Sequence, residues 1–210
     1  MASSTVQNLL ADYFPAFKAK RALPLYQIQA AEKLQACRTS QLGGHMQVCP
    51  QGHLNGIWYN SCKHRACPQC RGIQAERWLQ RTRNALIECP HHHMIFTVPH
   101  ELNFLWLNNR QLIADVLFHA VQNTINTLSK DNNHLRATPG YILALHTWGR
   151  NLTLHPHIHC LISHGGLNES TQTWQKPKRK SLFPAEPMRR LYRAKFIADL
   201  KIQLNEEKIN

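Results

Sequence analysis

The sequence predicts an α+β fold in two consecutive parts, and three observations support this prediction. Two amphipathic segments open the chain, and a segment that is rich in Cys and His but poor in core-forming residues follows them. The second half then alternates β-rich runs with segments of helical periodicity. An apolar content of 43% over 210 residues is enough for a folded core. We therefore expect a first domain over residues 1–89 and a second over residues 90–210.

The first part is predicted to contain three helices. Apolar residues follow helical spacing over residues 4–17, where Pro15 should kink or end the helix. Residues 24–36 start with a proline, which suits the first turn of a second helix. A third, basic helix is expected over residues 72–88. The dipeptide Cys89-Pro90 ends it and marks the predicted domain boundary.

The second part is predicted to be an antiparallel sheet with flanking helices. A short strand is expected over residues 93–99, and a long helix with one apolar stripe follows over residues 108–131. Residues 140–149 and 152–163 are two further strands, and the tight turn between them predicts a hairpin. A last helix is expected over residues 187–204.

The charge balance indicates a polyanionic partner. There are 25 Lys and Arg residues against 12 Asp and Glu, giving a formal charge of +13 and a pI near 9.8. Nucleic acid is the leading candidate, and a solvated basic surface without a partner is the alternative. The excess is concentrated in two places, which supply these candidate DNA contacts: Arg65, Arg71, Arg77 and Arg81, then Lys178, Arg179 and Lys180.

The cellular compartment is predicted from the lack of a membrane-spanning segment and of a signal-peptide pattern. Polar residues interrupt the longest apolar runs before they reach the length of a bilayer span, and residues 1–10 lack the pattern of a signal peptide. We expect a cytoplasmic protein without a membrane partner. The seven cysteines should then stay reduced, and their clustering indicates metal binding.

Eight Cys and His residues form a dense array that predicts structural zinc. The motif Cys-Pro-Gln-Cys at its end can present two thiolates to one ion. The array contains enough ligands for one or two zinc ions, and buried free cysteines with surface histidines are the alternative. Cys49, Cys62, Cys67 and Cys70 are the preferred ligands. The other candidates are Cys37, His45, His53 and His64.

Three histidines alternate along one predicted strand. His155, His157 and His159 share one face, and the residues between them face the core. The hairpin could bring His146 beside them as a further ligand. Two or three neutral imidazoles with open coordination positions suit a catalytic divalent ion. A structural cluster and a zinc hydrolase site are the alternatives.

Several motifs resemble the HUH (His-hydrophobic-His) endonuclease transposases of bacterial rolling-circle insertion sequences, of the insertion-sequence-91 type. The triplet is His157-Ile158-His159. The following motifs occur in the order of that family: CRTSQLGGH (37–45), YNSCKHRACPQC (59–70), FTVP (96–99), HTWG (146–149) and HPHIHCLISHGG (155–166).

The resemblance implies a zinc-binding domain that recognises transposon DNA, followed by a nuclease domain built on an antiparallel sheet. It implies that His157 and His159 hold Mg²⁺ or Mn²⁺, which polarises the scissile phosphate of a single strand at the transposon end. A tyrosine hydroxyl then attacks, leaving a 5′-phosphotyrosine and a free 3′-OH. His146 is our own geometric addition to this site.

The tyrosine nucleophile is the weak point of the resemblance. Relatives place it well beyond the triplet, whereas Tyr192 is the one tyrosine after His159 here, and its surroundings match no tyrosine motif. We expect a chain that stops before that motif, with Tyr192 a packing residue, and that binds DNA and metal without completing transposition. The alternative is a non-catalytic, zinc-dependent DNA-binding protein that regulates or competes with an intact transposase.

Overall fold

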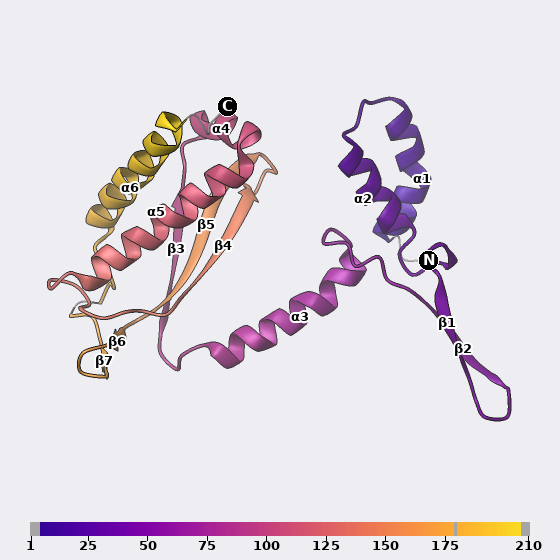
Figure 1. The fold of residues 1–210 in the computed structure, drawn as a ribbon, viewed down its shortest axis with the longest axis horizontal. Helices are drawn as coiled ribbons and strands as arrows, with labels where there is room; N and C mark the ends of the chain where they lie inside the picture. Colours follow the sequence, from indigo (N-terminus) through magenta and orange to yellow (C-terminus); the bar gives the residue numbers. More distant parts are fainter. Residues whose placement is uncertain (1–4, 179, 207–210) are drawn as a thin grey trace. The chain divides into compact units, whose positions relative to one another are not determined.

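The computed structural model describes residues 5–178 and 180–206, and it has the predicted α+β fold (Figure 1). The chain divides into two compact units, Met1–Leu86 and Ile87–Asn210. Each unit has its own helices and antiparallel strands. The division lies close to Cys89, where the sequence analysis put the boundary.

Two helices open the first unit and pack against each other. Helix α1 (Val6–Ala19) begins at Thr5, whose hydroxyl accepts a hydrogen bond from the main-chain N–H of Asn8 at 3.2 Å. Helix α1 continues through Pro15, so the proline does not end it. Helix α2 (Leu25–Gln35) follows and buries little apolar surface, because Ala31 is its one buried residue.

A hairpin and a basic helix complete the first unit. After a short 3-10 turn (Ser40–Leu42), strand β1 (Gly44–Val48) pairs antiparallel with strand β2 (Leu54–Tyr59). All five residues of β1 are exposed, so the apolar side chains of this hairpin, such as Met46 and Val48, do not build a core. Helix α3 (Pro68–Ala85) begins earlier than predicted, because Pro68 takes its first position.

The side chain of Gln7 holds these elements together. Its Nε2 donates hydrogen bonds to the main-chain oxygens of Gln35, at 2.5 Å, and of Cys37, at 3.0 Å. Its Oε1 accepts a hydrogen bond from Gln69 Nε2 at 3.2 Å. Helices α1, α2 and α3 thus meet through polar contacts around the buried cysteines, not through an apolar core.

The second unit is a three-stranded antiparallel sheet with the order β3-β5-β4. Strands β4 (Tyr141–Trp148) and β5 (Leu154–Ser163) form the predicted hairpin, and β3 (His91–Thr97) pairs with the other edge of β5. Helices α5 (Arg110–Lys130) and α6 (Ala185–Asn205) cover one face (Figure 1). The smaller elements are a 3-10 turn (His100–Leu102), α4 (Asn103–Asn108), β6 (Gly166–Asn168) and β7 (Thr173–Gln175).

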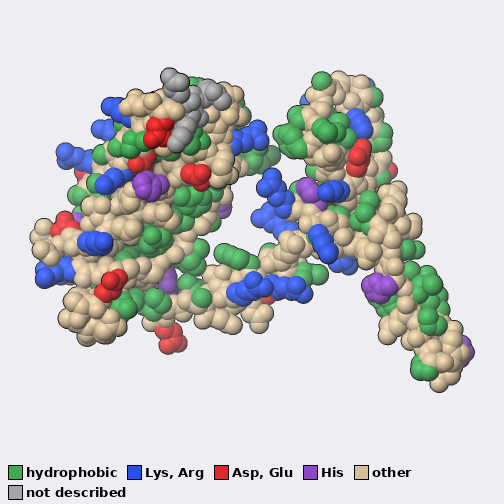
Figure 2. All heavy atoms as spheres, viewed as in Figure 1, with side chains coloured by type: hydrophobic (Ala, Val, Ile, Leu, Met, Phe, Trp, Pro, Cys, Tyr) green, Lys and Arg blue, Asp and Glu red, His purple; other side chains and the backbone are tan. Residues whose placement is uncertain are grey.

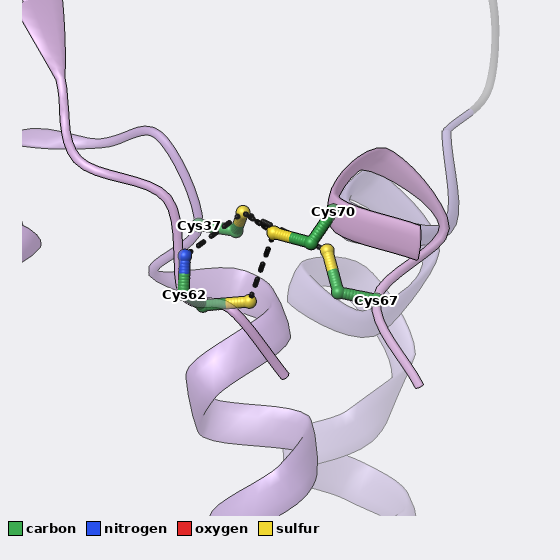
Figure 3. A group of neighbouring side chains, drawn as sticks. All are labelled: Cys37, Cys62, Cys67 and Cys70. Carbon is green, nitrogen blue, oxygen red and sulfur yellow. Dashed lines mark hydrogen bonds between the residues drawn. The ribbon is translucent and has the colours of Figure 1, made fainter. Parts of the chain in front are cut away.

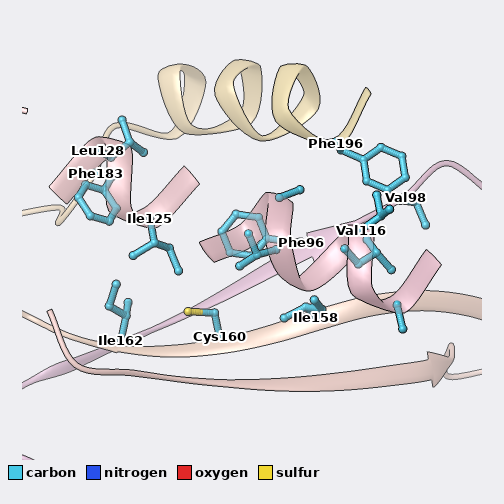
Figure 4. Close-up of a cluster of buried hydrophobic side chains, with 14 of the residues drawn as sticks. Phe96, Val98, Val116, Ile125, Leu128, Ile158, Cys160, Ile162, Phe183 and Phe196 are labelled. Atoms are coloured by element: carbon cyan, nitrogen blue, oxygen red, sulfur yellow. The ribbon is translucent and has the colours of Figure 1, made fainter. Parts of the chain in front are cut away.

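The core of this unit lies between the sheet and the two long helices (Figure 4). Ile158, Cys160 and Ile162 of β5 are fully buried and face α5. Burying an isoleucine side chain such as those of Ile158 and Ile162 stabilises the fold by about 1.5–3 kcal/mol. The core therefore fixes which face of β5 is turned away from solvent. In the described part of the chain, no helix has the length and apolarity needed to cross a membrane.

Substitution of Leu117 in α5 should strongly destabilise the second unit, because 0% of the surface of this residue is exposed. We expect Leu117→Ala to lower the free energy of unfolding of the second unit by about 2–5 kcal/mol, because it leaves a cavity. Urea denaturation followed by circular dichroism measures this loss. Leu107→Ala is the matched control, since Leu107 is 55% exposed, and its cost should stay within about 0.5 kcal/mol. Equal losses in the two variants would contradict this account of the core.

Candidate metal centres and basic surfaces

Four cysteine sulfurs meet at the centre of the first unit (Figure 3). Cys37 follows α2, Cys62 follows β2, and Cys67 and Cys70 lie at the start of α3. The Sγ atom of Cys37 is 3.5 Å from that of Cys70 and 3.6 Å from that of Cys67. The Sγ atoms of Cys62 and Cys70 are 3.7 Å apart. All four sulfurs lie within 4.8 Å of one another.

These distances fit a tetrahedral zinc site. With Zn–S bonds of about 2.3 Å, the edge of a tetrahedron of sulfurs is about 3.8 Å. Main-chain N–H groups also point at the sulfurs: Cys62 N lies 3.5 Å from Cys37 Sγ, and His64 N lies 3.5 Å from Cys62 Sγ. Lys63 has a φ of 51°, the left-handed conformation that turns the chain back toward Cys62.

The charge state of the cluster favours a cation. Burial raises the pKa of Cys37 to about 12 and also raises that of Cys62. Burial acts the same way on Cys70, but hydrogen bonds from the three other thiols outweigh it and lower the pKa of Cys70 to about 7. One thiolate is therefore readily formed among the four sulfurs. Further thiolates need a positive charge between them, which a zinc ion supplies.

The other four predicted zinc ligands lie outside this cluster. Cys49 Sγ is 3.5 Å from His53 Nδ1 at the turn between β1 and β2. The ring of His45 stacks on Trp58, and His64 Nδ1 accepts a hydrogen bond from Ala66 N at 3.2 Å. Cys37 thus takes the place that the sequence analysis gave to Cys49. The hairpin carries Cys49 toward its own turn, whereas the end of α2 brings Cys37 back to α3.

The second unit presents three histidines on the sheet face opposite the core. His146 of β4 is directly opposite His157 of β5, as the hairpin predicts. The Nε2 atoms of His157 and His159 are 3.1 Å apart, and a nitrogen from each of the three rings lies within 4.8 Å of the others. His157 is 8% exposed, whereas His146 is open to solvent.

An irregularity in the sheet lies beside these histidines. The β4–β5 ladder shifts register between His146 and Trp148, opposite the stretch that contains the fully buried Pro156. On the other side, the β3–β5 ladder ends at Thr97 and His157. Proline has no N–H to donate. Because one ladder shifts register here and the other ends, no ladder hydrogen bond from Pro156 is required. Such a bulge redirects neighbouring side chains.

Hydrogen bonds to the ring nitrogens orient the two central imidazoles. His157 Nδ1 lies 2.6 Å from the main-chain oxygen of His155, which can only accept, so Nδ1 carries the proton and Nε2 is a free ligand atom. His155 thus contributes its carbonyl. His159 Nδ1 lies 2.7 Å from His93 Nε2. The sequence analysis missed His93, although its alternation with Ile95 and Thr97 in the predicted strand was a usable signal.

The electrostatic environment keeps His159 neutral. Burial lowers its pKa, and the neighbouring His146, His157 and His93 lower it further. Neutral imidazole is the form that binds a metal ion. The exposed side chains around this cluster include Ile95, at 52%, and Trp148, at 59%. A ligand can therefore reach this face of the sheet at the exposed His146, whereas His157 is buried.

Tyr192 lies on the other side of the sheet. Its ring packs edge-on against Phe96, with centroids 5.1 Å apart, and against the apolar core. Its hydroxyl is buried without a hydrogen-bond partner among the described residues, and burial raises its pKa. Burial also raises the pKa of Cys160 to about 12. Both side chains belong to the core.

Most of the predicted DNA contacts are exposed side chains. Figure 2 shows Lys and Arg atoms along α3, where Arg71, Arg77 and Arg81 lie. Arg65 is exposed in the loop before this helix. In the second unit, Lys178 and Lys180 are exposed after β7. Arg179, the remaining candidate, lies outside the described residues.

Comparison with known proteins gives two family matches. Residues 9–98 match the family described as "Transposase zinc-binding domain", which covers all four clustered cysteines. Residues 140–210 match a family described as "Putative transposase", which covers His146, His157 and His159. No solved structure matches the chain.

Two curated proteins are similar to this chain. "Putative transposase y4qJ" of Sinorhizobium fredii is 34% identical over 197 residues, which is 93% of this chain and 50% of that protein. "Transposase for insertion sequence element IS801" of Pseudomonas savastanoi pv. phaseolicola is 36% identical over 145 residues, which is 68% of this chain and 34% of that protein. The chain thus spans half of the first relative and about a third of the second. The family matches and these relatives show together that the chain belongs to the insertion-sequence-91 family of transposases.

Proposed function

We propose that this chain binds transposon DNA and holds a divalent ion at His146, His157 and His159 for cleavage of a single DNA strand. The observation that carries the proposal is the 3.1 Å approach of the Nε2 atoms of the buried His157 and the half-buried His159, beside the exposed His146. The cluster lies on the sheet face away from α5 and α6, and one of its three members, His146, is exposed to solvent. With three protein ligands, an ion bound there would keep coordination positions open for phosphate oxygens.

The chemistry of the donor set supports a transition-metal ion. Three imidazole nitrogens within 4.8 Å of one another are suitable ligands, and Mg²⁺ prefers oxygen ligands more strongly than Mn²⁺ does. When bound, the ion polarises a phosphate oxygen and orients the strand. The chain itself contributes the position of the ligands: β5 fixes His157 and His159, β4 fixes His146, and the His155 carbonyl fixes the His157 tautomer.

The first unit is proposed to bind one structural zinc ion through Cys37, Cys62, Cys67 and Cys70. Their sulfur separations of 3.5–3.7 Å support this ligand set. The ion would hold the start of α3 against the end of α2 and thereby present the arginines of α3 to DNA. Phosphate contacts from these arginines would give affinity without reading the DNA sequence.

Tyr192 is excluded from the proposed chemistry. A nucleophile has to reach a phosphate held at the histidines, whereas the Tyr192 hydroxyl is buried on the core side of the sheet. The attacking hydroxyl of the transposition reaction is therefore proposed to belong to a residue other than Tyr192.

The zinc ligands can be tested with two cysteine variants. We expect the wild-type chain to contain about one equivalent of zinc by atomic emission, and Cys37→Ser to lose most of it because a four-ligand site loses one thiolate. Cys49→Ser is the matched control and should keep its zinc. Zinc loss in Cys49→Ser with retention in Cys37→Ser would refute the proposed ligand set.

The DNA-binding surface can be tested through its salt dependence. We expect Arg77→Ala combined with Arg81→Ala to weaken binding of a labelled single-stranded oligonucleotide, and to reduce the slope of log affinity against log salt by about 1.4. Fluorescence anisotropy measures both quantities. Lys18→Ala with Lys20→Ala removes the same charge from α1 and its end, and should leave the slope nearly unchanged. Identical slopes in the wild type and the arginine variant would count against α3 as the contact surface.

The histidine site can be tested with Mn²⁺ itself. We expect the wild-type chain to bind Mn²⁺ and so lower the electron paramagnetic resonance signal of the free ion. His157→Ala with His159→Ala should abolish this binding, because two of three ligands are lost. DNA affinity without metal should persist in the variant. His92→Ala with His164→Ala is the control, since it removes another hydrogen-bonded histidine pair, 2.6 Å apart. Unchanged Mn²⁺ binding in the first variant would disprove the proposed site.

A further inference from the structure

His93 is held against the proposed metal site by the pairing of β3 with β5. In that register Ile95 is opposite His159 and His93 is opposite Leu161, so His93 and His159 are diagonal neighbours on the same face. The two rings have centroids 4.9 Å apart and planes within 18° of parallel. The 2.7 Å contact between His93 Nε2 and His159 Nδ1 therefore runs close to both ring planes, where imidazole donors and acceptors point.

The tautomer of His159 decides whether the site can accept a cation. His157 Nδ1 donates to the His155 carbonyl, so the lone pair of His157 Nε2 faces His159 Nε2 across 3.1 Å. If His159 carries its proton on Nε2, that proton fills the space between the two nitrogens as a hydrogen bond to His157. If the proton is on Nδ1, two lone pairs face the same point, and a cation is needed to hold them there.

We propose that His93 is a positioning residue, which accepts a hydrogen bond from Nδ1–H of His159 and so keeps His159 Nε2 free to bind the metal ion. This inference rests on the proposed metal site at His146, His157 and His159. His93 adds a second fixed tautomer beside the one set by the His155 carbonyl. Such outer contacts orient a ligand and typically change metal affinity by about 10–100-fold when they are removed.

The proposed role of His93 differs from that of a metal ligand. The Nε2 atom of His93 is engaged by His159 Nδ1, and the three-nitrogen group within 4.8 Å consists of His146, His157 and His159. His93 lies on the edge strand and is exposed, whereas His159 is half-buried. His93 can therefore be replaced with little loss of packing, which makes its contribution to His159 measurable.

Three variants separate the hydrogen bond from the side chain. His93→Phe keeps a planar ring suited to a strand but has no acceptor. His93→Gln restores an acceptor, because its amide oxygen can receive the Nδ1–H of His159. His91→Phe is the matched control: it lies two residues earlier on the same strand and face, opposite Ser163, away from the cluster. Circular dichroism should give the same fold and melting temperature for all chains.

The first readout needs no metal. Long-range ¹H–¹⁵N correlation spectra of ¹⁵N-histidine-labelled protein report which ring nitrogen carries the proton. We expect the Nδ1–H tautomer for His159 in the wild type, His93→Gln and His91→Phe, and a shift toward the Nε2–H tautomer in His93→Phe. An unchanged His159 tautomer in His93→Phe would overturn the inference.

The second readout is the Mn²⁺ dissociation constant from electron paramagnetic resonance. We expect His93→Phe to weaken binding by about 10-fold or more, and His93→Gln to restore most of the affinity. Wild-type affinity in His93→Phe would overturn the role of His93. A wild-type chain that fails to bind Mn²⁺ would instead overturn the proposed metal site, and the His159 tautomer would still decide whether His93 orients that ring.

Discussion

The two-residue period of β5 is the constraint on which the second unit depends. Because β5 is the central strand, both of its ladders fix its register, and every side chain is assigned to one face. Ile158, Cys160 and Ile162 are buried under α5, so His157 and His159 have to face the opposite side. The fold and the proposed metal site are thus two sides of the same strand. The neighbouring strands complete the site, β4 with His146 and β3 with His93.

The first unit is organised by a different kind of interaction. Its buried cluster consists of Cys37, Cys67 and Cys70, and Leu34 and Cys62 pack against it. Such a cluster removes little apolar surface from water, so the hydrophobic effect contributes little here. Polar contacts of Gln7 and the cysteine sulfurs connect the helices instead. A metal ion at the four sulfurs would supply the binding energy that larger domains obtain from an apolar core.

Local patterns in the sequence predicted the parts of the structure that depend on nearby residues. Alternation and a tight turn predicted the β4–β5 hairpin and placed His146 beside His157. The alternation of His93 with Ile95 and Thr97 indicates which side chains share a face of β3. The contact of His93 with His159 depends on the pairing of β3 with β5, two strands far apart in the chain, and no local pattern specifies that pairing. The structure places Cys37, and not the preferred Cys49, beside the other three sulfurs, because the spacing of cysteines does not show where a hairpin carries them. The sequence analysis missed the short β1–β2 hairpin, although Met46 and Val48 alternate with His45 and Gln47 in β1.

The exposed hairpin also determines which substitutions the first unit can tolerate. In β1 every side chain is exposed, and in β2 all but one are, so most positions there carry no packing constraint. Most substitutions in this hairpin should cost little stability, whereas a substitution at any of the four clustered cysteines removes a sulfur from the cluster. Substitutions between Cys37 and Cys62 can therefore change the surface that the hairpin presents without removing a sulfur from the cluster.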